Sequence, residues 1–491
     1  MTGLFGTLNT ATSGLRAQQV ALQTTSHNLA NANTVGYSRQ RVTLEANAPQ
    51  SYAGIGQIGT GVLLNGITRV TDGFVTAQLQ NEQASLNRFQ QQSDIIGQLE
   101  AIYNEPTTTG IGNQLSELFV SWGNLASNPE SVTSKTLVLR QTETFLDTVN
   151  HATNKMDQLA GETVDLIAKD VLDFNELSKQ LKSVNDHIFS ATVKGEMPND
   201  LLDKQDMIIG DMKNIAGVKV DSTDKYGRQF VSLGGKDIVT ATEVNELERV
   251  KEIDADGVVS YTGAVMVEDT EVKLTSGSIM GLQESRVVVL AKKEELSEFI
   301  DNLAGAINTI HSTSTGLVEY DEDGIEVPVT SQNVFEGTDG NYKVNSELLK
   351  DPSKLVTGKS LANSVSGDGS RAKAIADLQQ TALGNDFLTD PANYDAEKMS
   401  FTNDPSGSTL FNKYNDIVTD MGITKQQADN MVANQSDLTA LLEQRQASIS
   451  GVDFNEEVVN MIQFQSSFQA NSRVISVISE MLDTLINRTG V

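Results

Sequence analysis

Cysteine is absent from this 491-residue chain, and aromatic residues make up only 5% of it. A chain without cysteine can form no disulfide, thiolate metal site or cysteine nucleophile, and so few aromatics predict thin cores. Apolar runs of about 18 residues or more, long enough to span a bilayer, are also missing. Residues 1–15 lack the basic start and apolar core of a cleavable signal peptide. We therefore expect no membrane insertion and, if the protein leaves the cell, export by another route.

Positive charge is scarce as well, because 36 Lys and Arg residues face 65 Asp and Glu residues, for a net charge of −29. Such a chain repels phosphate backbones and anionic lipid surfaces, so we expect no nucleic-acid partner. The four histidines have no histidine companion three or four positions away, which argues against a metal site. The length indicates about three domains at roughly 150 residues each.

Both ends of the chain share one pattern, in which large apolar residues recur every seven positions without an intervening proline. Such a seam stays continuous only by wrapping a partner helix. Residues 1–44 contain three arginines and no acid, whereas residues 453–491 contain five acids and two arginines, so opposite charge favours pairing of the ends. Periodicity alone would fit two unrelated surface helices equally well. The matched ends favour one coiled coil, and the residues predicted to pack in its seam are Leu8, Leu15, Leu22, Leu29, Met461, Phe464, Phe468, Ile475, Ile478, Leu482 and Leu485.

The pattern between the ends predicts a mainly α fold with a β insert. Helical spacing over residues 131–193 indicates one long helix, and a period of two between Lys204 and Gly281 indicates short strands. A probable hairpin, GLVEYDEDGIEVPV, lies in a polar stretch. We expect both termini to meet at one end and the β insert to lie farthest from them. The predicted domains are a terminal coiled coil (1–65 with 447–491), an elongated helical bundle (66–203 with 282–446, with a hairpin region near 315–345) and the inserted β domain (204–281).

Glycines at 54, 56 and 59 spell G-x-G-x-x-G, the spacing that lets backbone approach a pyrophosphate at a helix N-terminus. No apolar strand precedes them, and residues 61–67 read as a strand rather than a helix. We interpret the segment as a glycine-rich turn and expect no cofactor.

The pairs Asp254–Asp256 and Asp321–Asp323 resemble the alternating acids of calcium loops. The position that would supply the closing bidentate carboxylate is Gly263 in one case and Thr330 in the other, so both segments are predicted to be hairpin turns. Neither a G-x-S-x-G elbow nor a G-x-x-x-x-G-K-[ST] loop is present, and no acid pair stands out as catalytic. The sequence therefore predicts a protein that is not an enzyme.

Residues 28–40, NLANANTVGYSRQ, follow the N-terminal heptads and read as a helix stop. Asparagine tolerates the left-handed backbone and hydrogen-bonds nearby main chain, and glycine permits positive φ, so the chain leaves its helix at a set angle. A capped helix end with no further role would explain the same residues.

The same segment resembles the N-terminal signature of bacterial flagellar axial proteins, the rod, hook and hook-associated family. The run GVDFNEEVVNMIQFQSSFQANSRVISVISEMLDTLINR resembles the C-terminal segment of that family. Direct resemblance covers residues 1–70 and 447–491. Within the family, Tyr37-Ser38-Arg39-Gln40 and the long helical region after residue 74 are most similar to the hook-associated branch that joins hook to filament. The residues that would carry the signature and shape the bend are Asn28, Asn31, Asn33, Thr34, Gly36, Tyr37 and Arg39.

The resemblance implies a structural subunit without enzymatic activity, exported by the flagellar type III apparatus and located outside the cell in the flagellum. The terminal seam would pack the inner tube of a ring at the end of the hook. The implied partners are further copies of the chain, the hook protein, a second hook–filament junction protein and a cytoplasmic export chaperone on the C-terminal helix. Another axial protein is the nearest alternative. A flagellum-borne secreted enzyme would need its site in residues 204–370, and an adhesin would bind ligand through the β insert.

Overall fold

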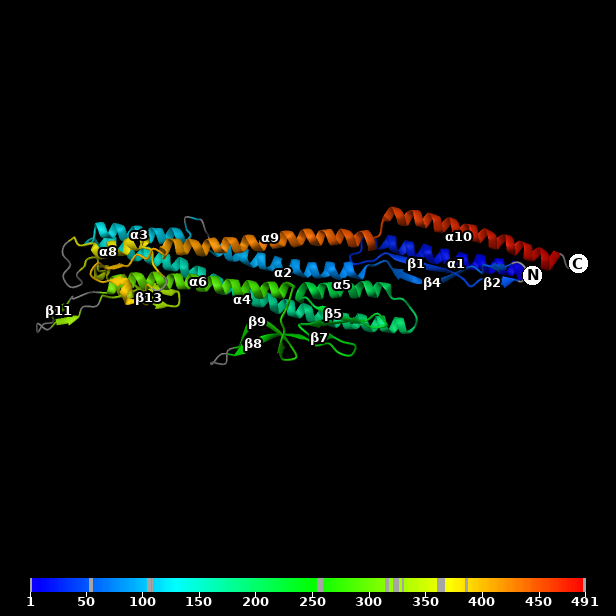
Figure 1. The fold of residues 1–491 in the computed structure, drawn as a ribbon, viewed down its shortest axis with the longest axis horizontal. Helices are drawn as coiled ribbons and strands as arrows, with labels where there is room; N and C mark the ends of the chain where they lie inside the picture. The colour runs from blue at the N-terminus through cyan, green and yellow to red at the C-terminus, as the bar shows by residue number, and fades with distance from the viewer. Residues whose placement is uncertain are drawn as a thin grey trace. The chain divides into compact units, whose positions relative to one another are not determined.

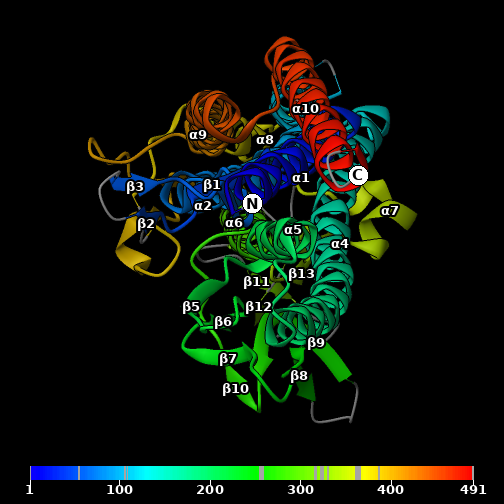
Figure 2. The same cartoon turned by 90° about the vertical axis from the view of Figure 1, so that its right-hand side faces the viewer.

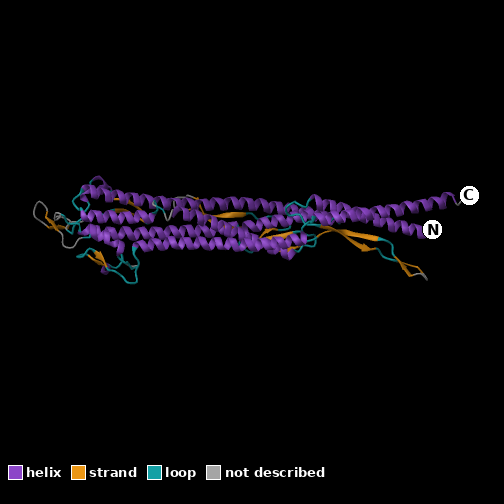
Figure 3. Ribbon diagram, turned by 90° about the horizontal axis from the view of Figure 1, so that it is seen from above, coloured by secondary structure: helices purple, strands orange, loops and turns teal. Residues whose placement is uncertain are grey.

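Helices dominate the chain, as the heptad and helical spacings predict (Figure 3). The computed structural model describes residues 2–52, 56–103, 107, 109–253, 259–313, 318–320, 326–328, 331–359, 367–384 and 387–488. The helices are α1 (Thr2–Ala30), α2 (Gly73–Tyr103), α3 (Ile111–Ser127), α4 (Val132–Val193), α5 (Asn199–Ala216), α6 (Ser278–Ser312), α7 (Ser346–Lys350), α8 (Ser370–Asp377), α9 (Leu410–Ser450) and α10 (Phe454–Asp483), with single turns η1 (Pro352–Lys354), η2 (Leu378–Gln380), η3 (Pro391–Asn393) and η4 (Thr484–Arg488).

The strands form small antiparallel ladders. They are β1 (Gln40–Ala46) with β4 (Val62–Arg69), β2 (Gln50–Tyr52) with β3 (Gly56–Ile58), β5 (Lys219–Thr223) with β6 (Gln229–Leu233) and β7 (Lys236–Val239), β8 (Leu247–Ile253) with β9 (Val259–Val267) and β10 (Thr270–Glu271), β11 (Val318–Tyr320) with β12 (Glu326–Pro328), β13 (Phe335–Thr338) with β14 (Asn341–Val344), and β15 (Tyr394–Asp395) with β16 (Ser400–Phe401). The predicted hairpin is confirmed, because Val318 pairs with Pro328. Its turn, with Asp321 and Asp323, lies outside the described residues, as do Asp254 and Asp256.

The chain divides into two compact units. Unit 1 contains residues 1–88, 168–280 and 433–491, and unit 2 contains residues 89–167 and 281–432. The boundaries fall inside helices α2, α4, α6 and α9. The elements confirm the predicted mainly α fold with long terminal helices.

In unit 1, α1 and α10 lie side by side, with the two chain ends close together (Figure 1). Helix α5 lies between α1 and the strands β5–β10 (Figure 2). Its apolar face buries Ile208, Ile209 and Met212, and the helix ends at Gly217, whose φ of +65° is the left-handed conformation that glycine adopts most readily. The hydrophobic core of this unit therefore lies around α5.

In unit 2, α3 packs on α8, and the core is built from apolar residues at helical spacing. Leu115, Leu118, Trp122 and Leu125 of α3 have no exposed surface. Arg371 of α8 is also buried, and its guanidinium donates to carbonyl oxygens at the end of α6, among them those of His311 at 3.2 Å and Thr313 at 3.0 Å. A buried cation at a helix C-terminus satisfies carbonyls that have no helical partner.

Two expectations about the β insert are wrong. Residues 204–216 belong to α5, so the strands begin at Lys219 rather than at Lys204. The insert also shares unit 1 with both termini instead of lying farthest from them. The reason is α4, which continues for 62 residues, begins in unit 2 and ends in unit 1. A helix of that length spans about 90 Å, so it returns the chain to the unit of the termini before the strands begin.

The glycine-rich segment around Gly56 and Gly59 is a hairpin, as expected. Strand β2 pairs with β3, and Gly56 has a φ of +103°. The next element is strand β4, so no helix begins at Gly59. Gly54 lies outside the described residues.

Candidate assembly site

The terminal helices α1 and α10 pack closely against each other. A Cβ atom added at Gly14 would lie 3.2 Å from the side-chain amide atoms of Asn471, so the absence of a side chain lets the two helices approach here. The α1 positions that are buried are mostly small or polar, namely Ala11, Ala17, Ala21, Thr24, Thr25 and Asn28.

The predicted seam residues lie along this pair but are not all enclosed by it. Leu8, Leu15, Leu22, Leu29, Met461, Phe464, Phe468, Ile475 and Leu482 are half-buried. Ile478 is buried, whereas Leu485 is 50% exposed. A single chain therefore covers the seam only in part.

A second apolar stripe runs along α10 on positions that the heptad reading did not select. Its large apolar members are 43% to 62% exposed; they are Val459, Ile462, Val474, Val477 and Met481. Ser466 and Ala470 continue the same stripe between Ile462 and Val474. A helix with apolar residues on two faces has more than one partner to pack against. The signal was present in the sequence as a second set of i, i+3 and i+4 spacings.

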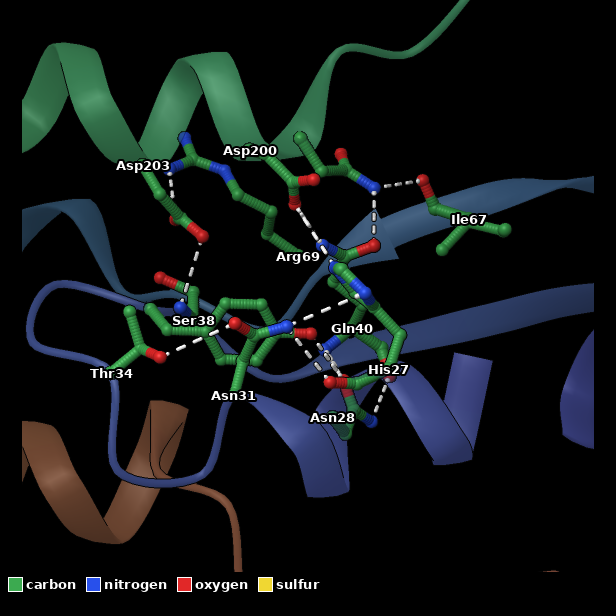
Figure 4. Close-up of polar contacts among 12 residues, drawn as sticks. His27, Asn28, Asn31, Thr34, Ser38, Gln40, Ile67, Arg69, Asp200 and Asp203 are labelled. Atoms are coloured by element: carbon green, nitrogen blue, oxygen red, sulfur yellow. Dashed lines mark hydrogen bonds and ion pairs between the residues drawn. The ribbon is translucent and has the colours of Figure 1, made fainter. Parts of the chain in front are cut away.

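The bend after α1 is held by Asn28, whose buried side chain hydrogen-bonds the main chain of Gln40 at the start of β1 (Figure 4). Its Nδ2 donates to the main-chain oxygen of Gln40 at 2.9 Å, and its Oδ1 accepts from the main-chain nitrogen of Gln40 at 2.9 Å. The Tyr37 hydroxyl also donates to Asn28 Oδ1, at 2.8 Å. The amide offers a donor and an acceptor on two separate atoms, as this pairing requires.

The other signature residues contribute in different ways. Asn31 donates to the main-chain oxygen of His27 at 3.1 Å and accepts from the Thr34 hydroxyl at 3.2 Å (Figure 4). Asn33 is exposed. Within residues 28–40 only Gly36 has positive φ, at +78°, so the asparagines act through side-chain hydrogen bonds and not through a left-handed backbone.

Arg39 joins the bend to the start of α10. Its guanidinium donates two hydrogen bonds to the Glu456 carboxylate, each 3.0 Å long, and its Nε lies 3.1 Å from Glu457 Oε1. Its main-chain nitrogen donates to the oxygen of Ser450 at 2.9 Å. Asp453 accepts from two main-chain N–H groups at the first turn of α10 and caps that helix.

Helix α5 holds the bend from the other side through acids spaced three residues apart (Figure 4). Asp203 accepts from the main-chain nitrogen of Ser38 at 3.0 Å and from Arg69 at 2.8 Å, while Asp206 accepts from Arg69 at 2.8 Å. Asp200 accepts from the side chain of Gln40 at 2.8 Å. We did not identify these acids from the sequence, where they look like a solvated helix face.

Asn199, at the start of α5, adds a further link (Figure 4). Its Nδ2 donates to the main-chain oxygen of Ile67 at 2.8 Å and lies 3.2 Å from Gln40 Oε1. Asn199 is buried, and through it α5 contacts both β1 and β4.

The charges around the bend shift the pKa values of Tyr37 and Arg69. Burial raises the pKa of Tyr37, and the carboxylates of Asp200, Asp203 and Glu457 raise it further, so its hydroxyl remains a donor to Asn28. Burial alone would lower the pKa of Arg69, but Asp206 and Asp203 raise it above its usual range.

Metal binding has no support in the described part of the chain, where no three His, Cys, Asp or Glu side chains are grouped to hold an ion. None of the helices in that part is long and apolar enough to cross a membrane.

Comparison with known proteins agrees with this geometry. Residues 96–324 match the family model of the flagellar hook-associated protein FlgK helical domain, residues 443–488 that of the flagellar basal body rod FlgEFG protein C-terminal region, and residues 8–37 that of the flagella basal body rod protein. These matches include both terminal segments on which the resemblance rested.

Full-length relatives carry one name. Flagellar hook-associated protein 1 of Bacillus subtilis is 27% identical over 524 aligned residues, covering 100% of this chain and 99% of the relative. The proteins of that name from Escherichia coli and Salmonella typhimurium are 25% and 26% identical, each covering 98% of this chain and 99% of the relative. The solved structure of the flagellar hook junction protein FlgK from Burkholderia pseudomallei has the same fold, with a TM-score of 0.59 at 14% identity over 76% of this chain and 100% of that one.

Paired terminal helices, a bend with the axial signature and matches at both ends define an axial structural protein of the bacterial flagellum. Within that class, the chain is a homologue of flagellar hook-associated protein 1 over its full length, and its helical middle matches the FlgK helical-domain model. It is thus a component of the flagellum that assembles with other flagellar proteins.

Proposed function

We propose that this chain is the structural subunit that joins hook to filament, assembled as a ring through its paired terminal helices. The observation that carries the proposal is the exposed apolar stripe of α10, which stands on the outside of the α1–α10 pair. Five large apolar side chains in one line would gain stability when covered. In a ring the same contact recurs in every subunit.

The bend supports the same function. Asn28, Arg39 and Asp203 fix the direction in which β1 leaves the terminal pair, because each is tied to the main chain or to an ion partner. Subunits that share one fixed angle can repeat around an axis. We assign the signature residues to this role and assign no catalytic role to any residue.

Specific partners and export extend the proposal. We propose contacts with the hook protein and with a second hook–filament junction protein at the two faces of the ring. We further propose export by the flagellar type III apparatus without a cleavable signal peptide, with a cytoplasmic chaperone on α10 before export. The apolar stripe of α10 would be the surface that such a chaperone keeps covered.

The test places a charge on the stripe. Ile462→Asp and Val477→Asp replace exposed side chains, so the isolated chain should keep its helix content by circular dichroism. In a ring each would bury an unpaired carboxylate at every contact, at a cost of several kcal/mol. We expect cells that export equal amounts of the variant to carry hooks without filaments.

Gln465→Asp is the matched control, since Gln465 is an exposed polar position of the same helix that lies off the stripe. It should leave filaments in place. Normal filaments on cells with both stripe variants would contradict assembly through this face.

A further inference from the structure

A cavity of about 750 Å³ opens in unit 1 between α2, α5, β5 and the segment that precedes α6. Its lining is polar and includes Asn81 of α2, Lys213 of α5, Lys219 of β5, and Thr275 and Ser276. The cavity shares Arg69 and Asp206 with the network that holds the bend, but Lys213 takes no part in the bend, in the stripe of α10 or in the proposed junction role.

Lys213 is the unusual group in this cavity. Its side chain is buried, with the residue 5% exposed, and its Nζ donates to Asn81 Oδ1 at 3.0 Å. No carboxylate among the described residues forms an ion pair with it. Burial lowers the pKa of Lys213, because the charged form has lost water without gaining a counter-charge.

Lys292 in unit 2 shows how the same chain treats another buried lysine. It is also 5% exposed, and its Nζ is held by Glu295 at 2.7 Å and by Asp420 at 2.5 Å. A buried ammonium is normally paired in this way. Lys213 offers three N–H donors and uses one of them on a neutral amide.

The other charges of the cavity do not supply the missing partner. Asp206 is engaged on both oxygens, by Arg69 at 2.8 Å and by the side chain of Gln229 at 3.3 Å. Arg69 and Lys219 add positive charge to the lining. The cavity is thus a positive site in a chain whose net charge is −29.

We propose that this cavity binds one anionic oxygen group, a carboxylate or a phosphate-like oxyanion, on the ammonium of Lys213. Thr275 and Ser276 also line the cavity, and hydroxyl side chains can donate to such a group. The group could be a free oxyanion or an acidic side chain from a second copy of this strongly acidic chain.

The experiment uses the full chain and inorganic phosphate as the probe. Isothermal titration calorimetry at constant ionic strength should show saturable binding of one phosphate per chain. Lys213→Met keeps the length of the side chain and removes its charge, so it should fold and bind phosphate at least about tenfold more weakly. Lys213→Arg should retain part of the binding. Lys273→Met, at an exposed lysine that does not line the cavity, should behave like the wild type.

Sedimentation velocity separates the two sources of the anionic group. If a second copy supplies it, the wild type should self-associate with rising concentration, phosphate should oppose this, and Lys213→Met should remain monomeric. If a free oxyanion supplies it, phosphate binds without changing the mass. The proposal is overturned if Lys213→Met matches the wild type in both measurements, or if phosphate does not bind and the wild type does not associate.

Discussion

Asn28 shows how one side chain can act as a main-chain partner at the start of a strand. It both donates to and accepts from the backbone of Gln40, a pairing that aspartate or leucine cannot reproduce. The position was predictable, because asparagine after a heptad run indicates a helix stop. The partners of the bend on α5, such as Asp203, were not predictable, because a hydrogen bond between residues 165 apart leaves no local pattern.

His311 offers a residue-scale prediction on pH. Its Nε2 accepts from the main-chain nitrogen of Val356 at 3.2 Å, so Nδ1 carries the proton and lies 2.7 Å from the oxygen of Gln332. The pKa of His311 is lowered to about 4, mainly by burial and also by the nearby Arg371 and Lys135, although the bond to Gln332 opposes the shift. The folded state therefore keeps this imidazole neutral.

The direction of the pH effect follows from the difference in proton binding between the folded and unfolded chains. Between pH 6.5 and 4 the unfolded chain binds a proton at His311 and the folded chain does not, so stability falls as pH falls through this window. We expect a loss of roughly 3 kcal/mol from this residue, with no further loss from it below pH 4. Trp122, which is the sole tryptophan and is buried in unit 2, reports the urea unfolding midpoint of the same unit by fluorescence.

His311→Gln should flatten this pH dependence. His151→Gln, at an exposed histidine of the same unit, should not change it. An equally steep acid loss in His311→Gln would show that another group is responsible.

At the scale of elements, the β insert begins and ends on two glycines that the packing requires. Gly277 has a φ of +92°, and a Cβ there would lie 2.5 Å from the main-chain oxygen of Ile215. Gly217 has a φ of +65°, and its Cβ would lie 2.4 Å from the Ser276 hydroxyl. The end of α5 and the segment before α6 are thus in backbone contact.

We expect Gly277→Ala to destabilise the insert by about 3 kcal/mol or more, because it adds a clash with main chain to the strain of positive φ. Hydrogen exchange measured by mass spectrometry should show lost protection in peptides from β5 to β10. Gly235→Ala is the matched control, since Gly235 has a φ of +85° with no atom near its Cβ position, and it should cost only about 1–2 kcal/mol. Equal effects from the two variants would mean that the close approach at Gly277 is not needed.

The elements themselves were largely predictable, and their placement was not. Seven-residue and helical spacings predicted α1, α2, α4 and α10 because each carries a regular apolar stripe. The same spacings carry no information on which unit a helix joins, so they did not place the β insert in one unit with the terminal helices. Residues 204–216 were misassigned because the period of two that begins at Lys219 was extended back to Lys204, into α5.

At the scale of the whole molecule, the boundary between the two units runs through helices rather than through linkers. Arg88 is the last residue of the first segment of unit 1 and lies inside α2. Proteases need an extended, accessible backbone, which a packed helix does not offer. The division into units is therefore not a division into separable pieces.

Limited trypsin digestion tests whether the helices that cross the unit boundary resist cleavage. We expect early cleavage after Lys194 and Lys225, which are exposed in turns, and slow cleavage after Arg88. Sequencing of the first fragments by mass spectrometry identifies the sites. Rapid release of a fragment that ends at Arg88 would show that α2 opens at the boundary.

The pairing of α1 with α10 joins the first thirty residues of the chain to nearly the last thirty. Synthesis proceeds from the N-terminus, so α1 waits without its partner until the residues between the two helices and α10 itself have been made. Closing a loop of that length costs little more entropy than closing a short one, and the pair can form as soon as α10 exists. A chain that stops before α10 cannot form the pair on which we propose that assembly depends, so it would stay out of the flagellum without any separate inspection step.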